Sequence, residues 1–98
     1  MSDSLEFEWD ENKRRTNLTK HGIDFGDAKE VFYDPAAYTA VSPRHVRERR
    51  YVIVGLMRGA LVAVIFTRRG GAIRIISVRA ARRSERQIYG AEAKKEGS

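Results

Sequence analysis

Four polar or basic side chains recur at helical spacing between Asp10 and Gly22: Lys13, Asn17, Lys20 and His21. At 100° per residue they fall within an arc of roughly 100°, so ammonium, amide and imidazole groups would project from one helix face. Such donors suit the phosphodiester backbone of a nucleic acid. Basic residues in a last turn also stabilise the helix dipole and bond its free carbonyls. An anion-binding face and a helix cap are therefore alternatives for Lys20 and His21.

Arginines on the expected strands form a second candidate group. Arg74 lies between two isoleucines in a strand that we expect to be covered. An unpaired cation there costs several kcal/mol, so we expect a structural ion pair. The candidate partners are Asp10, Asp27 and Glu85. Arg68 and Arg79 lie at strand ends, where an anion site and an ion pair are equally compatible with the sequence.

Two arginine-rich stretches, RHVRERR at residues 44–50 and RAARRSER at residues 79–86, form the third group. Guanidinium groups bind phosphate in a bidentate manner and stack on bases, which makes Arg50 a candidate contact. Charge runs are usually solvated faces, and Glu48 and Glu85 interrupt these two. Glu85 and Tyr89 have i,i+4 spacing on one helix, so a carboxylate and a phenol would project together. Such pairs are more often ordinary surface contacts than acid–base pairs.

Several chemistries are excluded by the residues. The chain has no cysteine, no glycine-rich phosphate loop, no serine nucleophile motif and no tight carboxylate cluster for a two-metal nuclease. His21 and His45 have no partners at metal-ligand spacing. We expect no cofactor and no metal site, so any cleavage of a phosphodiester would be independent of metal.

The charge of the chain points to an acidic partner. The formal net charge is +6 over 98 residues, which favours nucleic acid first and an acidic protein second. The acidic N-terminus lacks the apolar run of a secretory signal, and residues 60–66 are too short an apolar stretch to cross a bilayer. We therefore expect a cytoplasmic protein with no membrane contact.

The hydrophobic pattern predicts the elements that must position these residues. Strands are expected at residues 5–9, 37–41, 51–57, 60–67 and 73–78, with a hairpin turn at Arg58-Gly59. Helices are expected at residues 10–21, 24–33 and 81–91. The fold class is α+β: an antiparallel sheet of about four to five strands, covered by two N-terminal helices, plus a C-terminal helix. Residues 1–98 form one domain, with a structured core at 5–91 and a frayed tail at 92–98.

The sequence resembles the BrnT family of bacterial type II toxins from about Phe7 to Tyr89. The first block that carries the resemblance is WDxxKxxxNxxKHGIxF, within WDENKRRTNLTKHGIDFGDAKEVFYD. The second is IRIISxRxA…ER..Y, within IRIISVRAARRSERQIY. Both blocks occur in order and at the family's separation. The resemblance implies a fold similar to the RelE group of ribonuclease toxins and an RNA-cleaving activity that halts translation.

The resemblance also implies a partner. Toxins of this family are held inactive by a BrnA-type antitoxin that carries a ribbon-helix-helix DNA-binding dimer, in a complex that represses its own promoter. Because that dimer is obligate, we expect a 2:2 complex. The loop at residues 44–50 is more basic here than in relatives, and together with residues 79–86 it is the natural docking surface for a carboxylate-rich antitoxin segment.

The resulting hypothesis is metal-independent RNA cleavage through attack of the 2′-OH on the adjacent phosphate. His21 is the best titratable base, since imidazole titrates near neutral pH, and Glu85 is an alternative base. Lys20, Arg68 and Arg79 would stabilise developing charge. The expected RNA contacts are Lys13, Asn17, Arg50 and Tyr89. The rival hypothesis is a non-catalytic basic module that binds nucleic acid or protein.

Overall fold

The computed structural model describes residues 4–43 and 47–97, with side chains through residue 91. The elements in chain order are β1 (Glu6–Trp9), α1 (Glu11–His21), α2 (Phe25–Ala28), the 3₁₀ helix η1 (Lys29–Tyr33), β2 (Tyr38–Val41), β3 (Tyr51–Met57), β4 (Ala60–Arg69), β5 (Ala72–Ala80) and α3 (Arg83–Gly97). The predicted helix at 24–33 is thus α2 continued by η1. Helix α3 extends to Gly97, beyond residue 91, where the sequence predicted its end.

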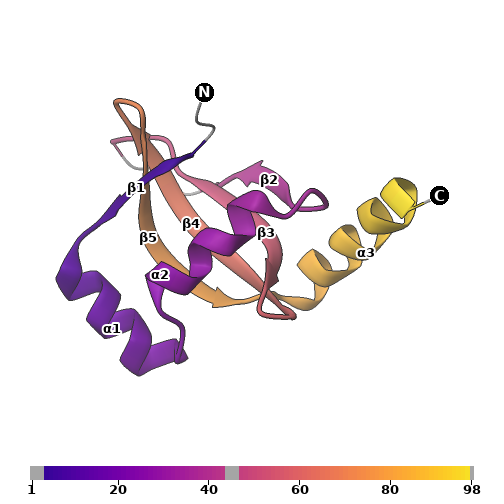
Figure 1. Ribbon diagram of the computed structural model, residues 1–98, viewed down its shortest axis with the longest axis horizontal. Helices are drawn as coiled ribbons and strands as arrows, with labels where there is room; N and C mark the ends of the chain where they lie inside the picture. Colours follow the sequence, from indigo (N-terminus) through magenta and orange to yellow (C-terminus); the bar gives the residue numbers. More distant parts are fainter. Residues whose placement is uncertain (1–3, 44–46, 98) are drawn as a thin grey trace.

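A single five-stranded sheet forms the centre of the fold, in the order β1-β5-β4-β3-β2 (Figure 1). The α+β class and the antiparallel meander of β2 to β5 are confirmed. Strand β1 differs, because it pairs with β5 in parallel, from Glu6 opposite Ala72 to Trp9 opposite Ile75. No short hairpin links these two strands, so nothing in the local sequence imposes an antiparallel arrangement.

The main core lies between the sheet and the α2–η1 segment. Phe25, Ala28 and Val31 are fully buried there. They pack against side chains from one face of the sheet, including Val62, Val64, Phe66, Ile73, Ile75 and Val78. Edge-to-face aromatic contacts continue this layer to β1, where Phe7 meets Phe32 and Trp9 meets Phe25. The covering layer is therefore α2 with η1.

Helix α1 lies beside the sheet rather than over it, so the expectation of two covering N-terminal helices is only partly met (Figure 1). The one buried residue of α1 is Asn17, which is 6% exposed. Its Nδ2 donates to the Ile23 carbonyl at 3.1 Å. Its Oδ1 accepts from the Val78 backbone N–H at 3.0 Å and from the Ser77 hydroxyl at 3.2 Å. Because β1 ends opposite Ile75, Asn17 supplies the acceptor that a longer neighbouring strand would supply.

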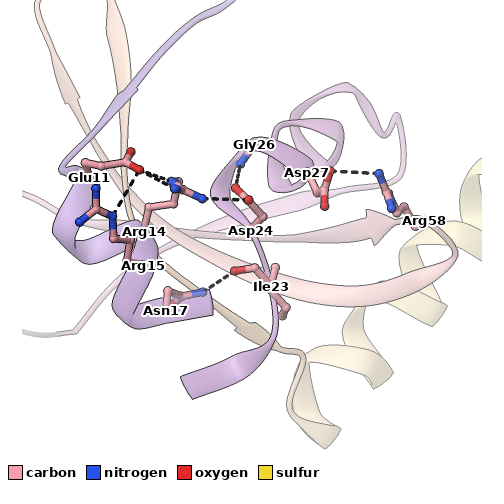
Figure 2. Close-up of polar contacts among 9 residues, drawn as sticks. All are labelled: Glu11, Arg14, Arg15, Asn17, Ile23, Asp24, Gly26, Asp27 and Arg58. Atoms are coloured by element: carbon pink, nitrogen blue, oxygen red, sulfur yellow. Dashed lines mark hydrogen bonds and ion pairs between the residues drawn. The ribbon is translucent and has the colours of Figure 1, made fainter. Parts of the chain in front are cut away.

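Polar contacts fix the ends of α1 and its junction with α2. The Asp10 side chain caps α1 by accepting from the backbone N–H of Asn12 at 2.8 Å. Arg14 donates to Glu11 at 2.8 Å and to Asp24 at 3.0 Å. Asp24 in turn caps α2 by accepting from the Gly26 N–H at 2.9 Å (Figure 2). The polar helix is thus held by hydrogen bonds and ion pairs in place of an apolar face.

We expect Asn17→Ala to lower stability by about 2–3 kcal/mol, because it leaves the Val78 N–H and the Ile23 carbonyl without partners. Thermal unfolding followed by circular dichroism should show a Tm lowered by roughly 10 °C or more. Lys13→Ala, an exposed change on the same helix, is the matched control and should leave the Tm nearly unchanged. Equal shifts for the two variants would contradict the role assigned to Asn17.

Candidate active site

The sheet face opposite α2 and η1 carries a hollow of about 320 Å³, here called the central hollow. Its lining residues are Ser42, Pro43, Arg50, Val52, Ile65, Ile76, Ser77, Arg79 and Arg82. Because side chains alternate along a strand, Val52 and Ile65 point away from the core that contains their neighbours Ile53 and Val64. The central hollow therefore combines an apolar floor with guanidinium and hydroxyl groups around it.

A β-bulge in β5 shapes this hollow. Phe66 pairs with Ile75 and Ile65 pairs with Ser77, which leaves Ile76 as an extra residue in β5. A bulge breaks the strict alternation of side chains. Ile76 and Ser77 consequently both line the central hollow although they are adjacent in sequence.

Arg79 is held in the central hollow by a bidentate ion pair with Glu85. Its two Nη atoms lie 2.8 and 2.9 Å from the carboxylate oxygens, and the side chains are only 19% and 16% exposed. Glu85 also accepts from the Arg82 N–H at 2.8 Å, just before α3 begins. The hydrogen bonds from Arg79 lower the pKa of Glu85, and the same contact raises the pKa of Arg79. Glu85 is therefore ionised but fully engaged, which makes it a poor proton acceptor.

Arg50 and Arg82 differ from Arg79, because among the described residues neither side chain has a hydrogen-bond or ion-pair partner. The Nε of Arg50 is buried and unpaired within that part of the chain. The Arg82 side chain is exposed. Glu85 interacts with the charge of Arg82 but forms no ion pair with it. The central hollow thus contains two guanidinium groups that form no ion pair among the described residues, a composition suited to an anion with several oxygens.

Two of the expected RNA contacts are internal. Asn17 uses its amide to join α1 to β5, so it has no surface for RNA. Tyr89 is 9% exposed and donates a hydrogen bond of 2.8 Å to Asp34. Burial and the Asp34 carboxylate raise the pKa of Tyr89 to about 12. Both side chains are thus engaged within the fold, and their contact with RNA stays a prediction. In a single sequence, a polar residue that pairs internally has the same pattern as one that faces a ligand.

The other predicted residues do not form one site. Arg68 is exposed and lines a different hollow, on the face that carries Phe66 and Phe32, so the sheet separates it from Arg79. Lys13, Lys20 and His21 are exposed on α1 and do not line the central hollow. Lys20 and His21 follow Asn17 by about one turn, on the same side of the helix.

The ion pair expected for Arg74 is confirmed, with a different partner. Arg74 contacts Glu8 at 2.9 Å, and not Asp10, Asp27 or Glu85. The parallel pairing of β1 places Glu8 directly opposite Arg74. Sequence reasoning missed Ser77 and Arg82 as lining residues. Arg82 lies within the basic run at 79–86, whereas the bulge that turns Ser77 toward the hollow has no simple signal in the sequence.

Fold and surface together define a basic α+β domain with an arginine-lined hollow suited to phosphate. The family model described as "Ribonuclease toxin, BrnT, of type II toxin-antitoxin system" matches residues 9–85. The chain belongs to this family of ribonuclease toxins. A comparison with curated proteins gives no match.

Within residues 4–43 and 47–97, no helix is long and apolar enough to span a membrane. Among the side chains of residues 4–43 and 47–91, no group of three or more His, Cys, Asp or Glu is arranged to hold a metal ion.

We expect Glu85→Gln to destabilise the fold by about 2 kcal/mol at pH 7, because it leaves the mostly buried Arg79 without its charge partner. Since the folded-state pKa of Glu85 is lowered, its contribution is complete above the unfolded value of about 4.3 and disappears as the pH falls through the folded value. The Tm difference from wild type should therefore shrink below about pH 4.

Glu11→Gln serves as the comparison, because Glu11 pairs with Arg14 at the exposed start of α1. It should lower the Tm less than Glu85→Gln at neutral pH. A Tm difference for Glu85→Gln that is constant from pH 3 to pH 7 would contradict the ion pair as its source.

Proposed function

We propose that this toxin is a metal-independent endoribonuclease that binds the scissile phosphate in the central hollow and thereby inhibits translation. The observation that carries the proposal is the convergence of Arg50, Arg79 and Arg82 on one hollow, where Arg50 and Arg82 form no ion pair among the described residues. Family membership supplies the reaction class, ribonuclease. The hollow supplies a place where a phosphate would be surrounded by guanidinium donors.

The proposed reaction is attack of the 2′-OH on the adjacent phosphorus to form a 2′,3′-cyclic phosphate. The 2′-OH gives its proton to a base as the 2′-oxygen bonds to phosphorus, the bond from phosphorus to the 5′-oxygen breaks, and the 5′-oxygen leaves as a hydroxyl after it takes up a proton. The 2′-OH restricts this reaction to RNA. Negative charge grows on the non-bridging oxygens in the transition state, where Arg50 and Arg82 would stabilise it. Arg79 would add a third donor in a position fixed beforehand by Glu85.

Proton transfer is assigned to α1 in this proposal. Glu85 is disfavoured as the base because Arg79 occupies both of its oxygens. His21 is the proposed base, with Lys20 as a supporting cation. Both are exposed one turn from Asn17, whose contact with Ser77 connects α1 to the wall of the central hollow.

One observation favours the rival function, a non-catalytic RNA-binding module. The described residues that line the central hollow supply guanidinium groups but no free carboxylate or imidazole. Such a surface would bind an RNA backbone without cutting it. Cleavage by the purified chain distinguishes the two functions.

We expect the purified toxin to cleave RNA in EDTA and to leave cyclic phosphate ends. Arg50→Ala and Arg82→Ala should each lower the cleavage rate by about 100-fold, as the loss of one transition-state donor does elsewhere. Their Tm should stay within a few degrees of wild type. Arg58→Ala is the charge-matched control, because Arg58 pairs with Asp27 at the β3–β4 turn and lines none of these hollows. Strict dependence on magnesium would contradict the mechanism, and binding without cleavage would favour the module.

The same assay tests α1. Lys20→Ala and His21→Ala should abolish growth inhibition and cleavage while the Tm changes by only a few degrees. A Tm lowered by about 10 °C, equivalent to 1–2 kcal/mol, would instead show that they act as helix caps. Asn17→Ala perturbs the same helix but removes no titratable group. A comparison of its cleavage rate with that of His21→Ala therefore shows whether a shifted helix or a lost base causes the loss of activity.

The proposed partner is a BrnA-type ribbon-helix-helix antitoxin that forms a 2:2 complex and binds its own promoter DNA. Family membership implies an antitoxin. The unpaired arginines of the central hollow would attract a carboxylate-rich segment, and its binding there would exclude RNA.

Light scattering of the co-purified pair should give the mass of two toxins and two antitoxins. Affinity should fall as salt rises from 0.1 to 0.5 M, because Arg82 is exposed and Arg50 is only partly buried, so salt screens their charges. A 1:1 mass would contradict the stoichiometry, and affinity independent of salt would contradict docking through arginines.

A further inference from the structure

A second hollow adjoins the central hollow, and the described residues that line it are all charged. Here called the loop hollow, it has a volume of about 530 Å³ and is lined by Arg47, Glu48, Arg50 and Arg69. Arg50 lines both hollows. One guanidinium therefore stands at the junction between the proposed site of the scissile phosphate and a neighbouring basic surface.

Strand β4 connects the two hollows along one face of the sheet. Ile65 lines the central hollow and Arg69 lines the loop hollow. Four residues along a strand span about 13 Å, and residues i and i+4 face the same side. Between them Thr67 is buried and donates to the Arg49 carbonyl at 2.7 Å, which anchors the chain that carries Arg50. The two hollows are thus parts of one surface with a fixed separation.

The charges of the loop hollow are open to a ligand. Arg47 has no side-chain partner among the described residues. Arg69 pairs with Glu48 at 3.4 Å, with side chains 54% and 38% exposed, so this ion pair is weak and replaceable. It contrasts with the mostly buried, bidentate pair of Arg79 and Glu85. With three arginines and one glutamate, the loop hollow keeps an excess of positive charge.

Arg50 supplies an independent observation. Its Nε is buried and has no hydrogen-bond partner within the described chain. Buried donors without a partner are rare in folded proteins, and each one calls for an explanation such as a missing ligand. A phosphate that binds a guanidinium side-on accepts from Nε and Nη together. An RNA backbone that passes between the hollows would bring phosphates to this side chain from either direction.

We propose that the loop hollow binds a second phosphate of the same single-stranded RNA, at a fixed distance from the cleaved linkage. This inference rests on the proposed function. An RNA backbone is favoured over a protein segment because none of the described residues that line the loop hollow is apolar. Protein interfaces are anchored by apolar and aromatic side chains, whereas contacts to a nucleic-acid backbone are made by charged ones. The toxin thereby selects extended single strands long enough to reach both hollows.

The test measures binding of a 2′-O-methyl oligonucleotide, which cannot undergo the proposed cleavage, by fluorescence anisotropy. Single linkages are replaced in turn by uncharged methylphosphonate. With wild-type toxin, two separate linkages should each lower affinity by about 5- to 10-fold when neutralised. In Arg47→Ala/Arg69→Ala toxin only one of these effects should remain, and in Arg82→Ala toxin only the other. The slope of log affinity against log salt should also fall by about 0.7 in the double variant, as expected for one lost phosphate contact to a single strand.

Glu48→Gln should change the affinity for the oligonucleotide in the opposite direction to the arginine variants. It frees Arg69 from its carboxylate and should raise affinity for the oligonucleotide, whereas a structural role for the ion pair would lower the Tm and leave affinity unchanged. Arg15→Ala/Arg58→Ala removes the same charge away from both hollows and is the control.

Two outcomes would overturn the inference. One is a methylphosphonate profile that is identical in wild-type and Arg47→Ala/Arg69→Ala toxin. The other is a double variant that loses affinity for the co-expressed antitoxin while it keeps full affinity for the oligonucleotide, which would make the loop hollow a protein interface. Failure of the proposed function is visible separately, since wild-type toxin would then bind the oligonucleotide but leave unmodified RNA intact.

Discussion

Strand β5 extends beyond the end of its neighbour β1, and the backbone groups of this open edge need hydrogen-bond partners. This requirement determines where α1 lies, and with it which face of the sheet stays exposed. Strand β5 has nine residues, whereas its outer neighbour β1 has only four. Backbone groups beyond Ile75 would face no strand, and an unpaired edge is both a loss of hydrogen bonds and a template for aggregation. Asn17 relieves part of this problem, because its single oxygen accepts from the Val78 N–H and the Ser77 hydroxyl. Helix α1 is therefore held at the edge of β5 by the amide of Asn17, and an extended apolar face is not required for this contact.

The position of α1 at the edge determines which surface stays available. The segment α2–η1 covers one face of the sheet, and on the other face the described part of α3 adds Tyr89 to a small cluster with Val54 and Ala63. The remainder of that second face is left for the central hollow. Glu85 then has two structural tasks at its boundary, since it fixes the Arg79 guanidinium and caps the start of α3. Such fixed donors lose little freedom when a ligand binds, which is the condition for electrostatic stabilisation of a transition state.

Sequence patterns predicted the elements better than the contacts between them. Alternation and β-branched runs identified the β3–β4–β5 meander, and Arg58-Gly59 identified its first turn, where both residues have positive φ. The parallel pairing of β1 was missed because strand direction between distant segments depends on tertiary packing, and the partner of Arg74 was missed with it. The alternation of side chains along β4, by contrast, is sufficient to place Arg68 on the same face as Phe66, away from the central hollow. The bulge at Ile76 and the burial of Asn17 and Tyr89 depend on contacts that a single sequence does not encode locally.

The arginines discussed above fall into two groups, those that form ion pairs between elements and those that form none. The first group stabilises the fold, and the second is available to a ligand. Arg14, Arg74 and Arg79 lie beside carboxylates that belong to neighbouring elements, and they hold those elements together. Arg50 and Arg82 form no ion pair among the described residues, yet they border the same hollow. A polyanion that bound there would accept hydrogen bonds from both guanidinium groups, and these bonds would add to its affinity. In the function proposed above, a carboxylate-rich antitoxin segment would contact the same guanidinium groups, so one surface would serve both the substrate and its inhibitor.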